Sequence, residues 1–401
     1  MPEEKLDSAV IRPEEPSTIF PDSIESTVRA TSSTTRNPST GQSSGMQQEE
    51  SSGTPAPLYV GIDLGTSRSS VCASNGHRAT LPTVVGWPKD PIARGFLKKD
   101  IVFGEEAIAN RLSIETVRPV EDGVIKVNSN QKPAAGHLES PDGKVKEAAS
   151  EFIKHLIELC EPLPNQQIFA AIGTPGQISS AHKDALLEAA KESIHQVHLT
   201  TEPFAVAFSL SGLHHVLVVD IGAGTTDLCR VHGSLPDSED YLTLEQAGDF
   251  IDFCLFELLE KNHKGAQFSR QQVTEIKEQF SSVAPGEPID VTLPVNGVPT
   301  KHNITSDMKQ ACSSIIESIA TAIRKLVGSY DPEFQAELKS QIWLSGGGSL
   351  INGLPKAIEH AISPLGAGTS VRRVPDPVFA GADGALKLVQ TMPADYRTVL
   401  S

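Results

Sequence analysis

The chain is poor in residues that several common protein classes require. Of its 401 residues, 5% are aromatic and five are cysteines, none of them in a C-x-x-C pair. Scattered cysteines in odd number argue against a disulfide scaffold or a zinc ribbon, and they favour a reducing compartment such as the cytoplasm. The scarcity of aromatic side chains leaves little for a stacking platform that would bind single-stranded nucleic acid.

Long apolar runs and an excess of positive charge are also missing. No run reaches the ~18 residues that a transmembrane helix needs. The N-terminus reads MPEEKLD and lacks the basic start and apolar stretch of a signal peptide. The formal net charge is −16. We therefore expect no direct contact with nucleic acid and no direct membrane insertion, since a basic footprint is missing.

The negative charge is spread unevenly along the chain. Residues 1–57 hold nine acidic and four basic side chains and are rich in Ser, Thr, Pro, Gln and Glu. Such a composition buries too little apolar surface to offset the entropy that folding costs. We expect residues 1–57 to form a disordered acidic tail, which leaves a net charge of −11 on residues 58–401.

From Leu58 onward, apolar strands alternate with amphipathic helices, which predicts an α/β fold. Strands are expected over residues 58–63, 69–74, 167–173, 196–200, 214–220, 228–233 and 340–345. Helices are expected over residues 145–160, 177–194, from Pro203, and over 249–262, 269–282, 305–328, 353–362 and 379–391. Residues 77–125 mix short strands and loops, and residues 128–144 look like an exposed loop.

One strand–turn–strand motif occurs twice in this pattern: an apolar strand ends in an aspartate, and a tight turn leads into a second strand. Asp63 precedes Gly65, Thr66 and Ser67, whereas Asp220 precedes Gly222, Ala223, Gly224, Thr225 and Thr226. Backbone N–H groups and hydroxyls of such turns bind anions, and glycine allows close approach. An aspartate at a strand end suits hydrated Mg²⁺. We interpret the pair as two hairpins that clamp the phosphates of a nucleotide.

A third glycine-rich element follows the strand expected at 340–345. It consists of Gly346, Gly347, Gly348 and Ser349. The competing phosphate motifs are missing, because the chain has neither a G-x-x-x-x-G-K-[ST] loop nor a G-x-G-x-x-G sequence. A single Asp-x-Gly-x-Thr turn also fits an ordinary turn, so the repetition favours a binding site.

With these elements, the sequence resembles the actin–Hsp70–sugar kinase superfamily of ATPases. GIDLGTS (61–67) and DIGAGTTD (220–227) look like its two phosphate loops, and LSGGGSLI (344–351) looks like its adenosine motif. DGVI (122–125) and AGADGAL (380–386) look like the places where two connecting helices begin at the hinge. The resemblance implies an actin-like (RNase H-like) fold of two α/β domains with a nucleotide cleft between them.

The resemblance also implies domain limits. Domain I would cover residues 58–210 and include a small subdomain at about 77–120. Domain II would cover residues 211–391, and its last helix, at about 379–391, would return to domain I. Residues 392–401 would form a C-terminal tail.

Further runs resemble the bacterial actins, and among them those associated with magnetosomes. They are TVVGWPKD (83–90), TEPFAVAF (201–208), IKEQFSSV (276–283) and DPVFAGADGALKL (376–388). The resemblance implies a cytoplasmic, cytoskeletal ATPase that binds ATP/ADP and Mg²⁺ and assembles with itself into head-to-tail filaments. These would run alongside magnetosome membranes and align magnetosomes into chains through connector proteins. Only the resemblance favours ATP over GTP.

The same resemblance assigns roles to single residues. Glu202 would orient the water that attacks the γ-phosphate, although Glu-Pro also suits any helix start. Asp220 would act with it in catalysis, and Asp63 and Asp220 would hold Mg²⁺ through water. Asp227 could support the metal or simply end its hairpin.

The nucleoside would contact glycines and one charged pair. Lys277 and Glu278 match the family's pair beside the ribose and base, although an exposed charged step of a helix is the alternative. Gly248 would approach the nucleoside, as would Gly346, Gly347, Gly348 and Ser349. Asp249 would either approach it as well or act as a helix N-cap.

Other functions of the superfamily fit less well. A cell-shape actin of the MreB type would bind membranes, for which an acidic, Ser/Pro-rich front end is poorly suited. A small-molecule kinase would carry a substrate-binding aspartate that we do not find. An Hsp70-type chaperone would need a peptide-binding domain, and the chain ends soon after the last cleft motif.

Overall fold

The computed structural model describes residues 55–125, 141–176, 178–210 and 212–400. Nearly all of the expected tail and most of the expected loop at 128–144 lie outside these residues.

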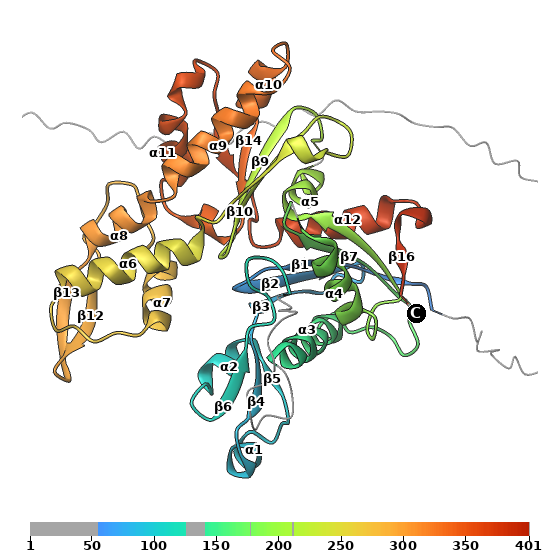
Figure 1. Cartoon of the computed structure of the whole chain (residues 1–401), viewed down its shortest axis with the longest axis horizontal. Coiled ribbons are helices and arrows are strands. Elements are labelled where there is room, and N and C mark those ends of the chain that lie inside the picture. The colour runs from blue at the N-terminus through green and yellow to red at the C-terminus, as the bar shows by residue number, and fades with distance from the viewer. Residues whose placement is uncertain (1–54, 126–140, 177, 211, 401) are drawn as a thin grey trace, which may run out of the picture. The chain divides into compact units, whose positions relative to one another are not determined.

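Two large sheets are built on the same plan (Figure 1). The first has the spatial order β16 (Thr398–Val399), β8 (Gln196–Thr201), β7 (Ile168–Thr174), β1 (Leu58–Leu64), β2 (Arg68–Ala73) and β3 (Arg78–Pro82). The second has the order β15 (Val371–Arg373), β14 (Ile342–Ser345), β9 (Val216–Ile221), β10 (Thr226–Val231) and β11 (Tyr241–Leu244). The central strand of each, β1 or β9, pairs antiparallel with the strand that follows it and parallel with its other neighbour.

Two smaller sheets extend from this framework. One has the order β5 (Val102–Phe103), β4 (Val85–Pro88) and β6 (Ile114–Val117), and it carries the short helices α1 (Pro91–Leu97) and α2 (Gly104–Ala109). The other is the hairpin of β12 (Asp290–Val295) and β13 (Val298–Asn303). The hairpin was not predicted, although Asn296 and Gly297, both with positive φ, are a recognisable hairpin signal.

Helices complete the two lobes around the sheets. The helices α3 (Pro141–Glu158) and α4 (Ser180–Ala190) pack on each other and on the core of the first sheet, α12 (Ala380–Thr391) contacts the first sheet, and α5 (Glu202–Ser209) contacts α12 and strands of both sheets. The others are α6 (Gly248–Asn262), α7 (Arg270–Phe280), α8 (Thr305–Ser313), α9 (Ile316–Gly328), α10 (Gln335–Ser340) and α11 (Leu354–Ala361). Short 3₁₀ turns occur at η1 (Ser238–Asp240), η2 (Gly347–Leu350), η3 (Ser363–Leu365) and η4 (Ala394–Tyr396). No helix in the described part of the chain is both long and apolar enough to cross a membrane.

One expectation about helices was wrong. The single helix expected over 305–328 is broken between α8 and α9, where the Ser314 hydroxyl and N–H both donate to the carbonyl of Ala311. A hydroxyl that bonds to the preceding turn competes with the helical pattern. Residues 122–125, where a connecting helix was expected to begin, form a turn, and residues 126–140 lie outside the described residues. Asp122 and Gly123 have positive φ and form a tight turn that Glu121 and Val124 close with backbone hydrogen bonds.

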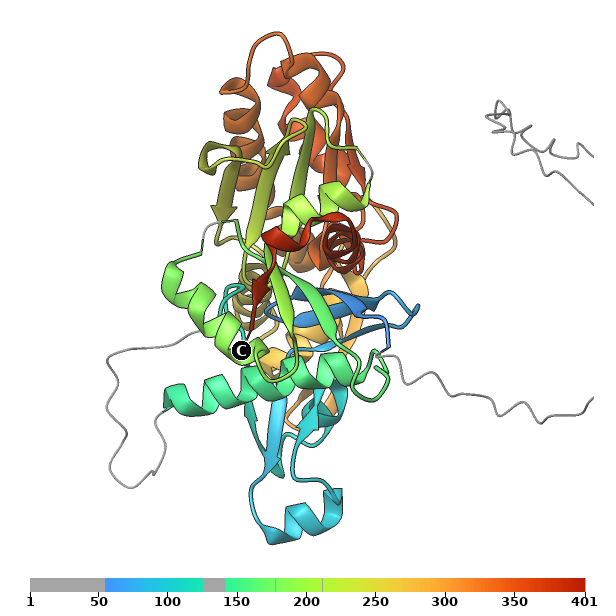
Figure 2. The same cartoon turned by 90° about the vertical axis from the view of Figure 1, so that its right-hand side faces the viewer.

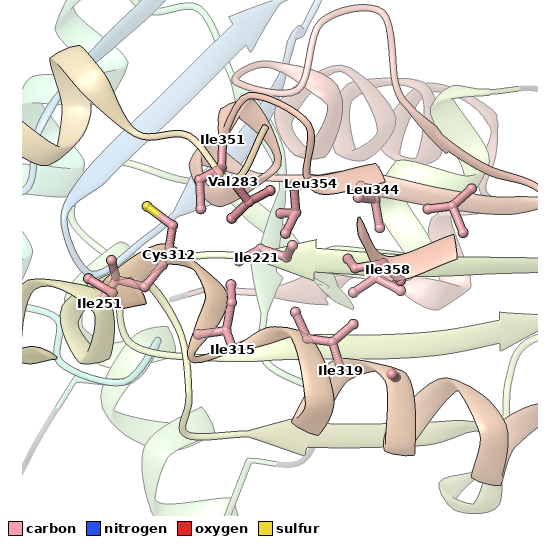
Figure 3. Packing of buried hydrophobic residues seen from close by; sticks show 14 of the residues in the cluster. Ile221, Ile251, Val283, Cys312, Ile315, Ile319, Leu344, Ile351, Leu354 and Ile358 are labelled. Carbon is pink, nitrogen blue, oxygen red and sulfur yellow. The ribbon is translucent and has the colours of Figure 1, made fainter. Parts of the chain in front are cut away.

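The second lobe has a large apolar core under its sheet. Figure 3 shows side chains from four elements meeting there, namely Ile221 from β9, Leu344 from β14, Ile319 from α9 and Ile358 from α11. All four are fully buried. This packing fixes the strand ends of β9 and β14 that carry the second hairpin and the glycine-rich element.

Helices α5 and α12 lie between the two sheets, and α12 is seen end-on in Figure 2. Their contact is very close, since a Cβ on Gly384 would lie 1.7 Å from the carbonyl oxygen of Ala205. Only glycine fits at that point. The helix α12 begins at Ala380, as expected. The small residues of AGADGAL (380–386) let it pack closely between the two sheets, next to the strand ends.

Candidate nucleotide site

A cavity of about 460 Å³ opens where β1 and β9 end. Its walls come from the turns after these two strands, the N-terminus of α6, one face of α7 and the glycine-rich segment after β14. Elements far apart in the sequence thus meet at one place, because the two sheets present equivalent strand ends to the same space.

Most residues expected at the site line this cavity. They are Asp63, Gly65, Thr66, Ser67, Glu202, Asp220, Gly222, Ala223, Gly224, Thr225, Gly248, Lys277, Glu278, Gly346, Gly347 and Gly348. Two expected residues do not line it, and both are fully buried: Thr226 donates its hydroxyl to the Gln246 carbonyl, and Ser349 donates its hydroxyl to the Gly346 carbonyl. These two hydroxyls support the turns from behind.

The first hairpin turn is held by its own sheet. The Thr83 hydroxyl, just after β3, donates to the carbonyl of Gly65 at 2.8 Å and is hydrogen-bonded to the Ser69 hydroxyl. The Thr66 hydroxyl accepts a hydrogen bond from the Gly123 N–H at 2.9 Å. The turn at Asp122 and Gly123 therefore contacts the first phosphate-binding candidate directly.

The second hairpin turn is held by a helix. The N–H groups of Gly248 and Asp249 donate to the carbonyls of Gly222 and Ala223, at 3.0 and 2.8 Å. The helix N-terminus thus satisfies its free N–H groups with the turn. Asp249 is not the N-cap, which is Ala247, so that alternative was wrong; Asp249 lies in the first turn of α6 and lines the cavity.

Three carboxyl groups from three elements face the floor of the cavity. Burial raises the pKa of Asp63, at the end of β1, to about 6. Burial, followed by the charges of Asp63 and Asp227, raises the pKa of Asp220 to about 8. Burial and the neighbouring carboxylates also raise the pKa of Glu202 well above its ordinary value. Such a cluster favours a bound cation, which would offset the mutual repulsion.

One carboxylate oxygen of this cluster is unpaired within the described residues. The Oε1 atom of Glu202 is buried and has no hydrogen-bond partner within the described residues. A buried carboxylate oxygen without a partner is costly, unless water or a ligand satisfies it. The residues present therefore suit a hydrated divalent cation and a positioned water beside Glu202.

Asp227 stands apart from these three. It does not line the cavity; its Oδ1 accepts hydrogen bonds from the Thr243 hydroxyl at 2.6 Å and the Gly176 N–H at 3.2 Å. Of the two roles considered for it, the contacts favour the structural one, in which Asp227 joins β10 to β11 and to the segment after β7.

The glycine-rich element approaches the second hairpin closely. Gly346 has φ +74°, and a Cβ there would lie 2.4 Å from the Oδ1 atom of Asp220. Only glycine combines this backbone conformation with that contact. The element must therefore be glycine-rich for β9 and β14 to bring Asp220 and the nucleoside wall together.

Sequence reasoning missed several residues of the wall. They are Arg68, Ser70, Thr80, Gly123, Ile251, Thr274, Ser281, Leu350, Ile351, Pro377 and Val378. Most are ordinary strand or helix residues that only tertiary packing brings to the cavity. Thr274 and Ser281 lie one turn from Lys277 on its segment, so helical periodicity alone could have found them.

Comparisons with known proteins identify relatives of this chain. The family model for the MreB/Mbl protein matches residues 58–396. The actin-like protein MamK of Paramagnetospirillum magneticum is 36% identical over 340 residues, which is 84% of this chain and 94% of the relative.

Two solved MamK structures are similar as well. One is a double helical filament, with 36% identity, coverage of 84% of this chain and 100% of the other, and a TM-score of 0.78. The other is a non-polymerising MamK variant bound to AMPPNP, with 35% identity, coverage of 84% and 99%, and a TM-score of 0.63. The protein therefore has an actin-like fold and belongs to the MreB/Mbl family of actin-like proteins.

Proposed function

We propose that the protein is a MamK-like cytoskeletal ATPase that binds ATP in this cavity, hydrolyses it to ADP and phosphate, and assembles into filaments. The observation that carries the proposal is the meeting of two equivalent hairpins and three carboxyl groups in one cavity. The similarity to a MamK filament and to a MamK variant bound to AMPPNP supports it.

The two turns bind the phosphates from opposite sides. Residues 65–67 act from the first hairpin and residues 222–225 from the second, through backbone N–H groups and hydroxyls. Asp63 and Asp220 hold Mg²⁺ through its water ligands. The ion, when bound, neutralises negative charge on the phosphates.

Glu202 orients the attacking water. It is the first residue of α5, and the charges of Asp63 and Asp220 act on its carboxyl group, which supports this role. Asp220 contributes to catalysis by keeping the phosphate and its ion in place, because phosphoryl transfer depends mainly on positioning and charge stabilisation.

The nucleoside lies between α6, α7 and the glycine-rich turn. Lys277 and Glu278 face it from α7, Gly248 from the start of α6, and Gly346, Gly347 and Gly348 from the segment after β14. In this proposal, domain I (58–210) and domain II (211–391) close on the nucleotide, with α12 returning to domain I.

The filaments are homopolymers with head-to-tail contacts, since a heterologous interface that does not close on itself gives an open polymer. By its likeness to MamK, the protein runs along magnetosome membranes in the cytoplasm and aligns magnetosomes through connector proteins. A cell-shape actin of the MreB type is the alternative. The 36% identity to MamK, compared with 18% to an MreB structure, favours the first.

Sedimentation with and without Mg²⁺-ATP tests the proposal. We expect polymer in the pellet and phosphate release in solution when Mg²⁺-ATP is present, and neither when it is replaced by buffer. A protein that stays monomeric at tens of micromolar across salt and pH, or that releases no phosphate, would contradict it.

A further inference from the structure

Behind the nucleoside wall, Asp252 of α6 forms a half-buried network with α7. Its Oδ2 atom lies 2.9 Å from the Nζ atom of Lys277 and accepts a hydrogen bond from the Thr274 hydroxyl at 2.9 Å. The two charged side chains are only 16% and 13% exposed. Lys277 lines the cavity, whereas Asp252 does not. No motif of the sequence pointed to Asp252.

The contacts hold the Lys277 ammonium in one place. A lysine side chain has four rotatable bonds and three N–H donors, so by itself it positions its charge poorly. Here Nζ donates to Asp252 and, at 3.0 Å, to the carbonyl of Gly248. Two donors are thus used behind the wall, which leaves the third for the cavity.

The pair is costly to bury and costly to break. Burial raises the pKa of Asp252, and the charge and hydrogen bond of Lys277 oppose this, while the nearby charge of Asp249 adds to the rise. The second oxygen, Oδ1, is buried and has no hydrogen-bond partner within the described residues. Removing one partner of such a pair would leave the other charge buried without compensation.

Gly248 connects this network to the second hairpin turn. Its carbonyl accepts from Lys277, and its N–H donates to the carbonyl of Gly222 in the second hairpin turn. A continuous set of hydrogen bonds therefore runs from Asp252 through Lys277 and Gly248 to the turn after β9.

We infer that Asp252 is a positioning residue, which holds the Lys277 ammonium against the nucleoside and links that contact through Gly248 to the second phosphate turn. The inference rests on the proposed nucleotide site and goes beyond it, since it assigns a role to a residue that does not contact the ligand. ADP and ATP share the nucleoside, so loss of Asp252 weakens both alike.

A double-mutant cycle on nucleotide binding tests the inference. Dissociation constants for ADP and AMPPNP are measured for the wild type, Asp252→Asn, Lys277→Met and the double variant. We expect Asp252→Asn to raise both constants by roughly ten-fold and Lys277→Met to add little in its presence, as for residues acting through one contact. At saturating ATP the rate of phosphate release should change by less than about three-fold, since the chemical step is untouched.

Two controls separate this role from general stability. Glu257→Gln changes an exposed carboxyl on the same helix and should bind ADP like the wild type. Asp252→Glu keeps the carboxylate and should recover part of the affinity, which also provides a result if Asp252→Asn fails to fold.

The inference is overturned if Asp252→Asn folds and binds ADP normally, if its effect and that of Lys277→Met are additive, or if Asp252→Glu folds and recovers nothing. If the wild type itself binds neither nucleotide, the proposed function fails instead, so the two failures are distinguishable.

Discussion

The two hairpins at the cavity have the same topology and are held in different ways. The turn after β1 is anchored inside its own sheet by the Thr83 hydroxyl. The turn after β9 is anchored by the first N–H groups of α6, which belongs to the outer part of the other lobe. One copy of the repeated hairpin is therefore held within its own sheet, and the other is held by a helix that also lines the cavity.

The aspartates of the two hairpins also differ, because their surroundings raise their pKa values to different extents. Burial raises the pKa of Asp63 to about 6, whereas burial and two neighbouring carboxylates raise that of Asp220 to about 8. Asp220 also lies against Gly346. The second hairpin thus carries the larger electrostatic cost, and a bound cation should relieve more of it there. The comparison can be tested in four ways, from the largest expected effect to the smallest.

The largest effect is expected at Glu202, which lines the cavity together with both hairpins. Glu202→Ala should keep nucleotide binding and filament assembly but slow phosphate release by roughly 10²–10⁴-fold, the usual contribution of a positioned acid or base. Phosphate release and sedimentation are measured on the same samples. Hydrolysis at the wild-type rate would remove Glu202 from the mechanism.

The second-largest effect is a difference between Asp63 and Asp220 in their contribution to Mg²⁺-nucleotide binding. Asp220→Ala should weaken Mg²⁺-ADP binding by roughly 100-fold, and Asp63→Ala by roughly 10-fold, the range seen for residues that act on a metal through another ligand. Titration calorimetry with and without Mg²⁺ measures both. Equal losses would mean that the two hairpins share the ion evenly, and unchanged affinity for Asp220→Ala would remove its assignment.

A smaller effect is expected from pH. Both aspartates must lose their protons to hold the cation, so Mg²⁺-ADP affinity should fall as pH drops through about 8 and again through about 6. Without divalent ions, pH acts on stability in the opposite direction. Because each folded-state pKa lies above the unfolded value, the folded protein binds more protons than the unfolded chain. The midpoint of thermal unfolding should therefore fall as pH rises through this range. Asp220→Asn should remove the step near pH 8, and its persistence would contradict the assignment.

The smallest effect concerns the hydroxyls that support the turns. Thr226→Val in the second hairpin removes one hydrogen bond, with a loss of about 1 kcal/mol in the free energy of unfolding. Thr83→Val in the first hairpin removes two, to the Gly65 carbonyl and the Ser69 hydroxyl, with a loss of about 2 kcal/mol. Denaturant titration measures both. Thr226→Val should leave the ligand contacts in place, because its side chain does not line the cavity, and a large loss of ADP affinity would contradict this.

Much of this arrangement follows from local sequence patterns. Asp63 and Asp220, each after an apolar strand and before a Gly/Thr turn, predict both hairpins, and the glycines after β14 predict a third wall. The match to bacterial actins placed Glu202 and Lys277. Each of these patterns is short and carries its own chemistry, so a single sequence is enough to find it.

The rest depends on contacts between distant segments. Asp252 looks like an ordinary polar position of an amphipathic helix, and only the packing of α6 on α7 brings it to Lys277. The long helical pattern over 305–328 is interrupted at Ser314, whose N–H bonds to the carbonyl of Ala311, three residues back. Thr226 belongs to the recognisable motif, yet the register of β9 and β10 turns its side chain away from the cavity. The direction in which such a side chain points depends on tertiary contacts, and a local sequence pattern carries no information about them.

The central claim is that one nucleotide is held by both hairpins in the assembled protein. An electron cryo-microscopy map of the protein assembled with Mg²⁺-ATP tests it most directly. The account predicts nucleotide density in the cavity, with phosphates between residues 65–67 and 222–225 and an ion one water away from Asp63 and Asp220. A filament with an empty cavity, or phosphates bound by one hairpin alone, would contradict it.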